Sequence, residues 1–235
     1  AALPWFSLSS LSIACRIALM WYDRYRPKSS VPGHWRKEVF QVPYYAPSCF
    51  SFSMLGVLVG FYREELTTKL PCLLPWTWMA ALLILQGVAS FMADVYSLAK
   101  SSWWHLVDAL QASFLVGIYT EVMIFGLSHG SLRGSLQLLC AAAGYLGAFV
   151  AFMRSRGSRK GADASAARYA FWHSLWHFIF PASSSGVVLI SVHVPGDAPP
   201  GRSPLVYMAF ILACMVVGLL WAVYNSFISR SSKGE

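Results

Sequence analysis

Charged side chains are scarce in this sequence. Asp, Glu, Lys and Arg make up only 12% of its 235 residues, whereas hydrophobic residues make up 57%. A water-soluble domain usually carries about a quarter charged residues. Apolar runs of about 17 to 25 residues, each long enough to cross a bilayer as a helix, recur along the whole chain and leave no room for a soluble domain. The composition therefore predicts an integral membrane protein.

The sequence also lacks paired cysteines and a compact basic patch. Its cysteines stand singly, with no CxxC pair, which argues against a zinc ribbon or a disulfide framework. We expect each to be a small apolar packing residue. The formal net charge of +8 reflects basic residues in the loops between apolar runs. Membrane topology explains that placement better than a nucleic-acid partner does. The cysteines are Cys15, Cys49, Cys72, Cys140 and Cys214.

Seven apolar segments predict the fold class, an all-α transmembrane helix bundle of about seven spans forming one domain over residues 1–235. The segment 4–22 contains Arg16 and the segment 165–182 is short, so both are also compatible with a helix lying at the membrane interface. The predicted spans are 4–22, 46–62, 73–98, 103–127, 131–153, 165–182 and 203–228.

Lys and Arg gather on one side of these seven spans. The loops 23–45, 99–102 and 154–168, together with the tail after residue 228, hold most of them. Because basic loops tend to remain on the cytoplasmic side, this face is predicted to be cytoplasmic in type. The carboxyl terminus is then expected on that face, the amino terminus opposite, and membrane lipids as partners.

A few polar residues stand inside the predicted spans, where charge is costly and marks a functional site by default. The span 73–98 runs toward the basic face, while the spans 103–127 and 165–182 start from it. Polar residues near these ends are therefore expected at one depth. They are Ser90 and Asp94 in the first, His105 and Asp108 in the second, and His173 and His177 in the third.

Three of these residues form a candidate metal site. His173 and His177 are spaced i, i+4 and can present imidazole nitrogens to one ion, and Asp94 could complete a zinc site with a position left for water. Zinc would acidify that water and polarise a carbonyl, which suits hydrolysis of a lipid amide or ester. In this scheme Asp108 holds the water or acts as base, and Ser90 donates to the developing oxyanion.

The same polar residues are also compatible with purely structural roles. A histidine pair at i, i+4 is, by itself, more often structural than metal-binding. Asp94 and Asp108 are also compatible with ion pairs at the membrane edge, where the candidate partners are His105, Lys100 and Arg168. The protein would then be a non-catalytic subunit of a larger membrane complex, in contact with lipids or pigments. A transporter is less well supported, because no inverted repeat or pair of broken spans is found.

The same residues resemble the pattern of the CREST superfamily of seven-helix membrane hydrolases, which includes alkaline ceramidases, progestin and adipoQ receptors, post-GPI-attachment proteins and myomaker-like proteins. That pattern has Ser and His four apart at the end of one helix, Asp near the start of the next, and HxxxH in a late helix. Here the matching residues are Ser90, Asp108, His173 and His177. The sequence HSLWH at residues 173–177 looks most like the corresponding motif of the myomaker and post-GPI-attachment branches. The resemblance implies zinc-dependent hydrolysis of a membrane lipid.

The sequence departs from the family in three ways. Asp94 stands where the family has a zinc-binding His, so one ligand is changed. Only about one whole span separates the Asp108 helix from the HxxxH helix, fewer than the family places there, and a further span follows. The prediction is therefore either an active hydrolase or a degenerate relative that keeps the metal as a structural clip.

Overall fold

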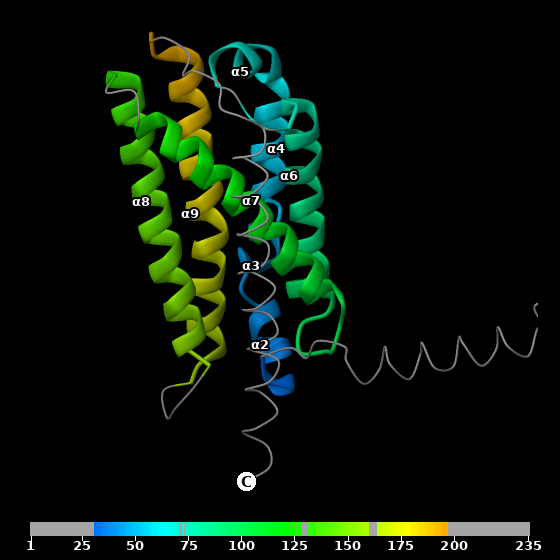
Figure 1. The fold of residues 1–235 in the computed structure, drawn as a ribbon. Helices are drawn as coiled ribbons and strands as arrows, with labels where there is room; N and C mark the ends of the chain where they lie inside the picture. Colours follow the sequence, from blue (N-terminus) through cyan, green and yellow to red (C-terminus); the bar gives the residue numbers. More distant parts are fainter. Residues whose placement is uncertain (1–30, 71, 73, 128–130, 160–163, 197–235) are drawn as a thin grey trace, which may run out of the picture.

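The computed structural model describes residues 31–70, 72, 74–127, 131–159 and 164–196, and for 123–127 the helical backbone alone (Figure 1). All regular structure in this part of the chain is helical. The predicted spans 4–22 and 203–228 lie outside the described residues.

Three helices are long and apolar enough to cross a membrane, and they coincide with the predicted spans 73–98, 131–153 and 165–182. This confirms an all-α fold with several candidate spans, while the count of seven stays a prediction. The first candidate is continuous from α6 (Trp76–Ser90) into a π-helix, η2 (Phe91–Tyr96). The other two are α8 (Leu132–Gly157) and α9 (Ala166–His193).

The predicted span 46–62 is the second half of a bent pair of helical segments. The pair joins Gly33–Phe40 to Tyr45–Phe61 at an angle of 89°, which makes it a fourth candidate, either a broken span or a re-entrant loop. Its elements rise along the bundle from one end to the other and are followed by the short α5 (Figure 1). The elements of the pair are η1 (Gly33–Trp35), α2 (Arg36–Phe40), α3 (Tyr45–Ser48) and α4 (Ser51–Phe61), and α5 spans Arg63–Lys69.

Helix α7 (Trp104–Leu127) covers the predicted span 103–127 with 24 residues. This helix is not one of the three candidate spans, which were identified from the described residues alone. Asp108, Gln111 and the buried Glu121 lie on it. In Figure 1 it crosses the bundle diagonally, from the α6 side to the start of α8. This path brings its first turns beside η2, where the candidate site lies.

Helix α9 is longer than predicted, since it continues past residue 182 to His193. The run Ser183–Ser185 looks like a loop in the sequence, yet each hydroxyl bonds within the bundle. Ser184 and Ser185 donate to carbonyl oxygens one turn earlier on α9, and Ser183 donates to the carbonyl of Cys140 on α8. Hydroxyls that bond back to the helix in this way do not interrupt it. The predicted end at residue 182 is therefore corrected.

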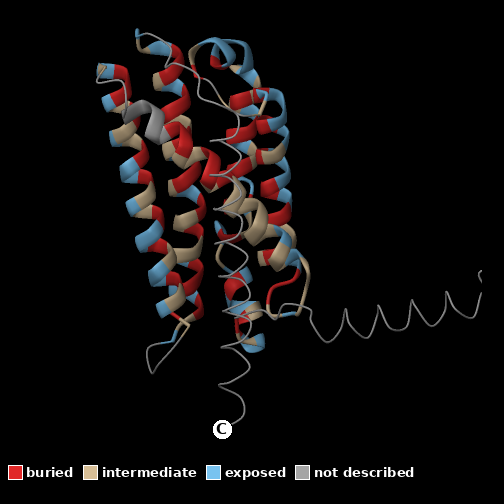
Figure 2. Cartoon of the chain, viewed as in Figure 1, coloured by how far each residue is buried: buried red, intermediate tan, exposed pale blue. Residues whose placement is uncertain are grey.

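The described residues form two apolar cores. One joins Trp35, Val39 and Tyr169 around α2, α3 and the start of α9; the other fills the space between α4, α6, α7 and the rest of α9. Buried residues line the faces that these helices turn toward one another, whereas α8 exposes its outer face (Figure 2). That outer face carries large apolar side chains, as lipid contact requires. They are Leu132, Leu139, Leu146, Phe149, Val150 and Met153.

Candidate metal centre

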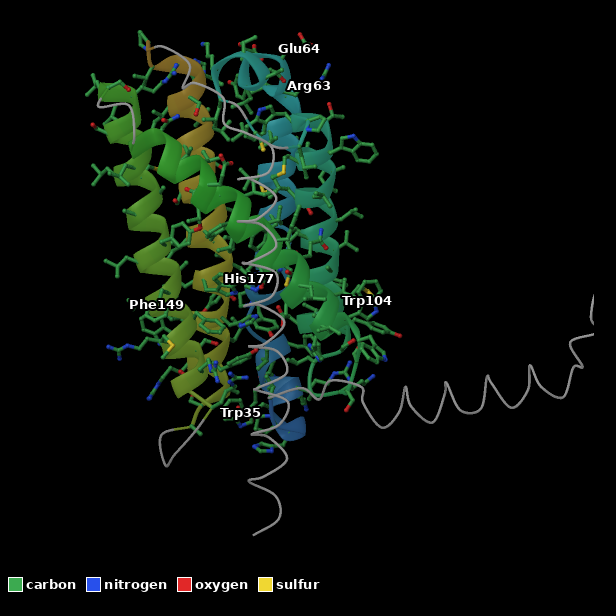
Figure 3. The ribbon with its side chains drawn as sticks, viewed as in Figure 1. Trp35, Arg63, Glu64, Trp104, Phe149 and His177 are labelled. Atoms are coloured by element: carbon green, nitrogen blue, oxygen red, sulfur yellow. The ribbon has the colours of Figure 1, made fainter. Side chains whose placement is uncertain are left out.

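The bundle has one strongly basic end. We call it the basic end and define it by Arg36 and Lys37 of α2, Lys100, and Arg154 and Arg156 in the last turn of α8. Figure 3 shows Trp35 toward this end, Arg63 and Glu64 at the opposite end, and His177 inside the bundle between them. The polar residues that the sequence predicts to meet lie at this depth, on α6, η2, α7 and α9.

Asp94 lies against both histidines of α9. Its Oδ2 atom is 3.0 Å from Nε2 of His173 and 3.4 Å from Nε2 of His177. Zinc bonds to nitrogen and oxygen of about 2.0–2.1 Å in a tetrahedral site place neighbouring ligand atoms about 3.3 Å apart. Asp94 thus lies at ligand spacing from each imidazole, and of the two histidines His177 shares with Asp94 a group of ligand atoms close enough together for one ion.

A fourth potential ligand is Cys49, which lies between α3 and α4 and is only 1% exposed. One ligand atom each from Cys49, Asp94 and His177 lie within 4.8 Å of one another. Cys49 thus belongs to the candidate site, contrary to the expectation that every cysteine only packs. The sequence carries no signal for it, because metal-site cysteines are recognised by close pairs and Cys49 stands alone.

A side-chain hydrogen bond from α4 holds the backbone of α9 at His177. Pro181 has no N–H, so it cannot donate to the carbonyl oxygen of His177 one turn earlier. The Ser51 hydroxyl of α4 lies 2.5 Å from that oxygen and 2.7 Å from the carbonyl oxygen of Ser48, and with its one proton on the shorter contact it replaces the missing donor. The imidazole is 2% exposed, and its Nδ1 atom has no hydrogen-bond partner among the described residues. A buried nitrogen of this kind fits a residue that binds a further ligand.

The π-helix η2 directs Asp94 toward α9. In an α-helix Ser90 and Asp94 would lie one above the other, as the sequence predicts. Here the amide of Ser97 bonds to the carbonyl of Met92, five residues earlier, which is the π-helical pattern. The wider turn separates the two polar residues, so that Ser90 faces α7 and Asp94 faces α9. Single π-helical turns occur frequently at functional sites.

Asp108 forms a second polar group beside the first. Its Oδ1 atom accepts a hydrogen bond of 2.5 Å from the Ser90 hydroxyl and one of 2.7 Å from Nε2 of Gln86. Gln86 was not among the predicted site residues, although it is a polar residue one turn before Ser90 in an apolar run. His105 does not pair with either aspartate, since its Nε2 lies 3.1 Å from the carbonyl oxygen of Lys100.

Aromatic side chains cover the candidate site on the side of the basic end. The ring of Tyr169 stacks on His173 with 5.1 Å between centroids, and the ring of Tyr45 lies 5.6 Å from His173. The Tyr45 hydroxyl also donates to the backbone carbonyl of Asp94. The side chains of His173 and Asp94 remain 15% and 16% exposed. Access from this end is therefore narrow.

An apolar cavity of about 50 Å³ lies between α4, α6, α7 and α9, next to the polar residues. Leu83 and Phe180 line it, and each lies three residues, or about one helical turn, from Gln86 and His177 respectively. The lining is apolar apart from Tyr119 and Ser184. The other lining residues are Leu55, Val59, Leu70, Trp76, Met79, Leu115, Ile118, Val122, Val187 and Val188.

Comparison with known proteins identifies no related protein in which this site is described. No family model, curated protein or solved structure matches this chain. The resemblance to the CREST superfamily therefore stays a prediction, carried by Ser90, Asp108, His173 and His177.

Proposed function

We propose that this protein is a zinc-dependent hydrolase that acts on an amide or ester bond of a membrane lipid. The observation that carries the proposal is the convergence of Asp94 Oδ2 on the Nε2 atoms of His173 and His177, at 3.0 and 3.4 Å. Cysteine, imidazole and carboxylate donors are all groups that bind zinc, and the site lies in a helix bundle with several candidate membrane spans. Zinc would acidify a bound water and polarise the scissile carbonyl.

Asp108 is the proposed proton acceptor. It is a second carboxylate, and two donors fix one of its oxygens, so its position is set before a substrate binds. Ser90 accordingly acts first as the residue that positions Asp108. The oxyanion contact predicted for Ser90 would require its hydroxyl to exchange the Asp108 bond for the substrate.

The apolar cavity supports a lipid as the substrate. It begins about one turn from His177 and Gln86 and follows α9 to Val188, which is suited to an acyl chain whose carbonyl carbon lies beside the metal ligands. The lipid headgroup would then point toward the basic end, where Arg and Lys side chains can contact phosphate.

A non-catalytic subunit is the competing function, and the narrow access to His173 and Asp94 favours it. In that case the metal would act as a clip between η2 and α9, and the lipid-facing surface of α8 would contact a partner helix. This alternative predicts bound zinc without turnover, which separates it from the hydrolase.

The test is hydrolysis of acyl-labelled lipid amides and esters by the full chain in nanodiscs, with zinc present or removed by a chelator. We expect zinc-dependent release of fatty acid and a fall of about 10²–10⁴-fold for Asp108→Asn, because that change removes the proton acceptor. Glu64→Gln, on an exposed carboxylate at the opposite end, is the matched control. Bound zinc without turnover of any lipid, or equal rates for Asp108→Asn and wild type, would refute the hydrolase.

A further inference from the structure

We propose that the thiolate of Cys49 is a metal ligand together with Asp94 and His177, while His173 positions Asp94 without binding the metal. This inference rests on the proposed zinc site and deepens it, because it replaces one predicted ligand and changes the chemical class of the donor set. The sequence predicted nitrogen and oxygen donors only.

The geometry that points to Cys49 is the mutual spacing of three ligand atoms. Cys49, Asp94 and His177 each offer one such atom within 4.8 Å of the other two. Both Cys49 and His177 are almost fully buried, at 1% and 2% exposure, whereas the side chain of His173 is 15% exposed. Asp94 is 16% exposed, so an ion here would lie on its inner side, between the two buried donors, where charged ligands stabilise it most.

His173 has the contacts of a positioning residue. Its Nε2 atom bonds to Asp94 Oδ2 at 3.0 Å, the shorter of the two histidine distances, and its ring lies stacked on Tyr169. A hydrogen-bonded carboxylate keeps the orientation that a metal ligand needs. This role also leaves a coordination position for water, which a catalytic zinc site requires and which four protein ligands would occupy.

A thiolate ligand has a consequence for metal choice. Thiolates favour zinc and its chemical relatives over magnesium, calcium and manganese, which prefer oxygen donors. The site should therefore bind zinc or cobalt and should not respond to magnesium.

Cobalt(II) provides a direct test, since a thiolate bound to cobalt gives a charge-transfer absorption band in the near ultraviolet. We expect this band from the cobalt-loaded full chain, its loss in Cys49→Ser, and its retention in Cys140→Ser, which changes a cysteine of α8. His173→Ala should keep the band and weaken cobalt binding by about 10–100-fold, as removal of an outer contact does. The visible ligand-field bands of cobalt depend on how many ligands it has, so a change in these bands in His173→Ala, with cobalt still bound, would show that His173 is a ligand and would contradict the positioning role.

X-ray absorption at the zinc edge of the wild-type chain tests whether Cys49 binds the metal without the need for a variant. One sulfur neighbour at about 2.3 Å, beside nitrogen and oxygen at about 2.0–2.1 Å, is expected. Stoichiometric zinc with nitrogen and oxygen neighbours alone would overturn the role of Cys49 and leave the zinc hydrolase standing. A chain that binds neither zinc nor cobalt would overturn both.

Discussion

The carboxylate of Asp94 lies 3.0 Å from the imidazole of His173, although 79 residues separate them in the chain. This contact joins the π-helix at the end of one candidate span to the first turns of α9. Because His177 lies one turn further on the same face of α9, a single carboxylate oxygen faces both imidazoles. The candidate site depends on this arrangement, and its first test is the removal of the carboxylate charge.

Asp94→Asn should abolish stoichiometric zinc binding. The amide keeps the shape of the side chain and can still hydrogen-bond to His173, but it is a far weaker zinc ligand than a carboxylate. Elemental analysis of the detergent-purified chain measures the effect. Glu65→Gln, on the exposed surface of α5, is the control and should retain wild-type zinc. Full zinc content in Asp94→Asn would show that the ion binds elsewhere.

Ser90→Ala should slow hydrolysis by about 10–100-fold and leave zinc content unchanged. The change removes one of two donors to Asp108, and a hydrogen bond to a charged group contributes about 1.5–3 kcal/mol. Ser113→Ala is a matched control on α7, because its hydroxyl bonds only to the carbonyl of Ala109 within its own helix. Steady-state rates in nanodiscs provide the measurement. A rate equal to that of the control variant would remove Ser90 from the site.

Ser51→Ala should destabilise the fold by about 1–3 kcal/mol, because the His177 carbonyl then loses the donor that replaces the missing N–H of Pro181. Adding Pro181→Ala restores a backbone N–H and should recover much of this loss. Thermal unfolding in detergent of the two single variants and the double variant gives the coupling energy between them. Ser185→Ala, whose hydroxyl only supplements a bond within α9, should be close to neutral. Strictly additive effects of the two changes would show that the Ser51 hydroxyl does not replace the N–H that Pro181 lacks.

Val188→Phe should shorten the longest acyl chain that the protein hydrolyses. Val188 lines the cavity and is 5% exposed, so a larger side chain takes up space there. The neighbouring Leu189 is 39% exposed and does not line the cavity, which makes Leu189→Phe the matched control. Competition between labelled lipids of different chain length reports the preference. An unchanged preference in Val188→Phe would mean that acyl chains bind outside the cavity.

Much of the helical fold follows from the sequence alone. The predicted spans 73–98 and 131–153 lie close to the bounds of two helices that are long and apolar enough to cross a membrane, because an uninterrupted apolar run can be recognised without knowledge of its neighbours. The end of α9 could not be predicted in this way. Whether Ser183 interrupts a helix depends on the Cys140 carbonyl of another helix, and that contact exists only in the folded bundle.

The candidate site was predicted in part. The i, i+4 spacing of His173 and His177 and the charge of Asp94 inside a span identified three residues that the structure brings together. Cys49 was missed, since its place beside Asp94 comes from the packing of the bent pair of helical segments against η2 and α9. The hydrogen bonds of Asp108 with Ser90 and Gln86 were likewise missed. The π-helical turn that directs Ser90 toward α7 and Asp94 toward α9 leaves no pattern in the sequence.

The central claim is that one zinc ion binds at Asp94 inside the bundle. The most direct measurement is an experimental structure of the zinc-loaded chain, with anomalous diffraction recorded above and below the zinc absorption edge. We predict one anomalous peak about 2.0–2.3 Å from ligand atoms of Cys49, Asp94 and His177. A zinc-loaded crystal in which Asp94 still bonds directly to His173 and His177, with no anomalous peak among these residues, would contradict the account.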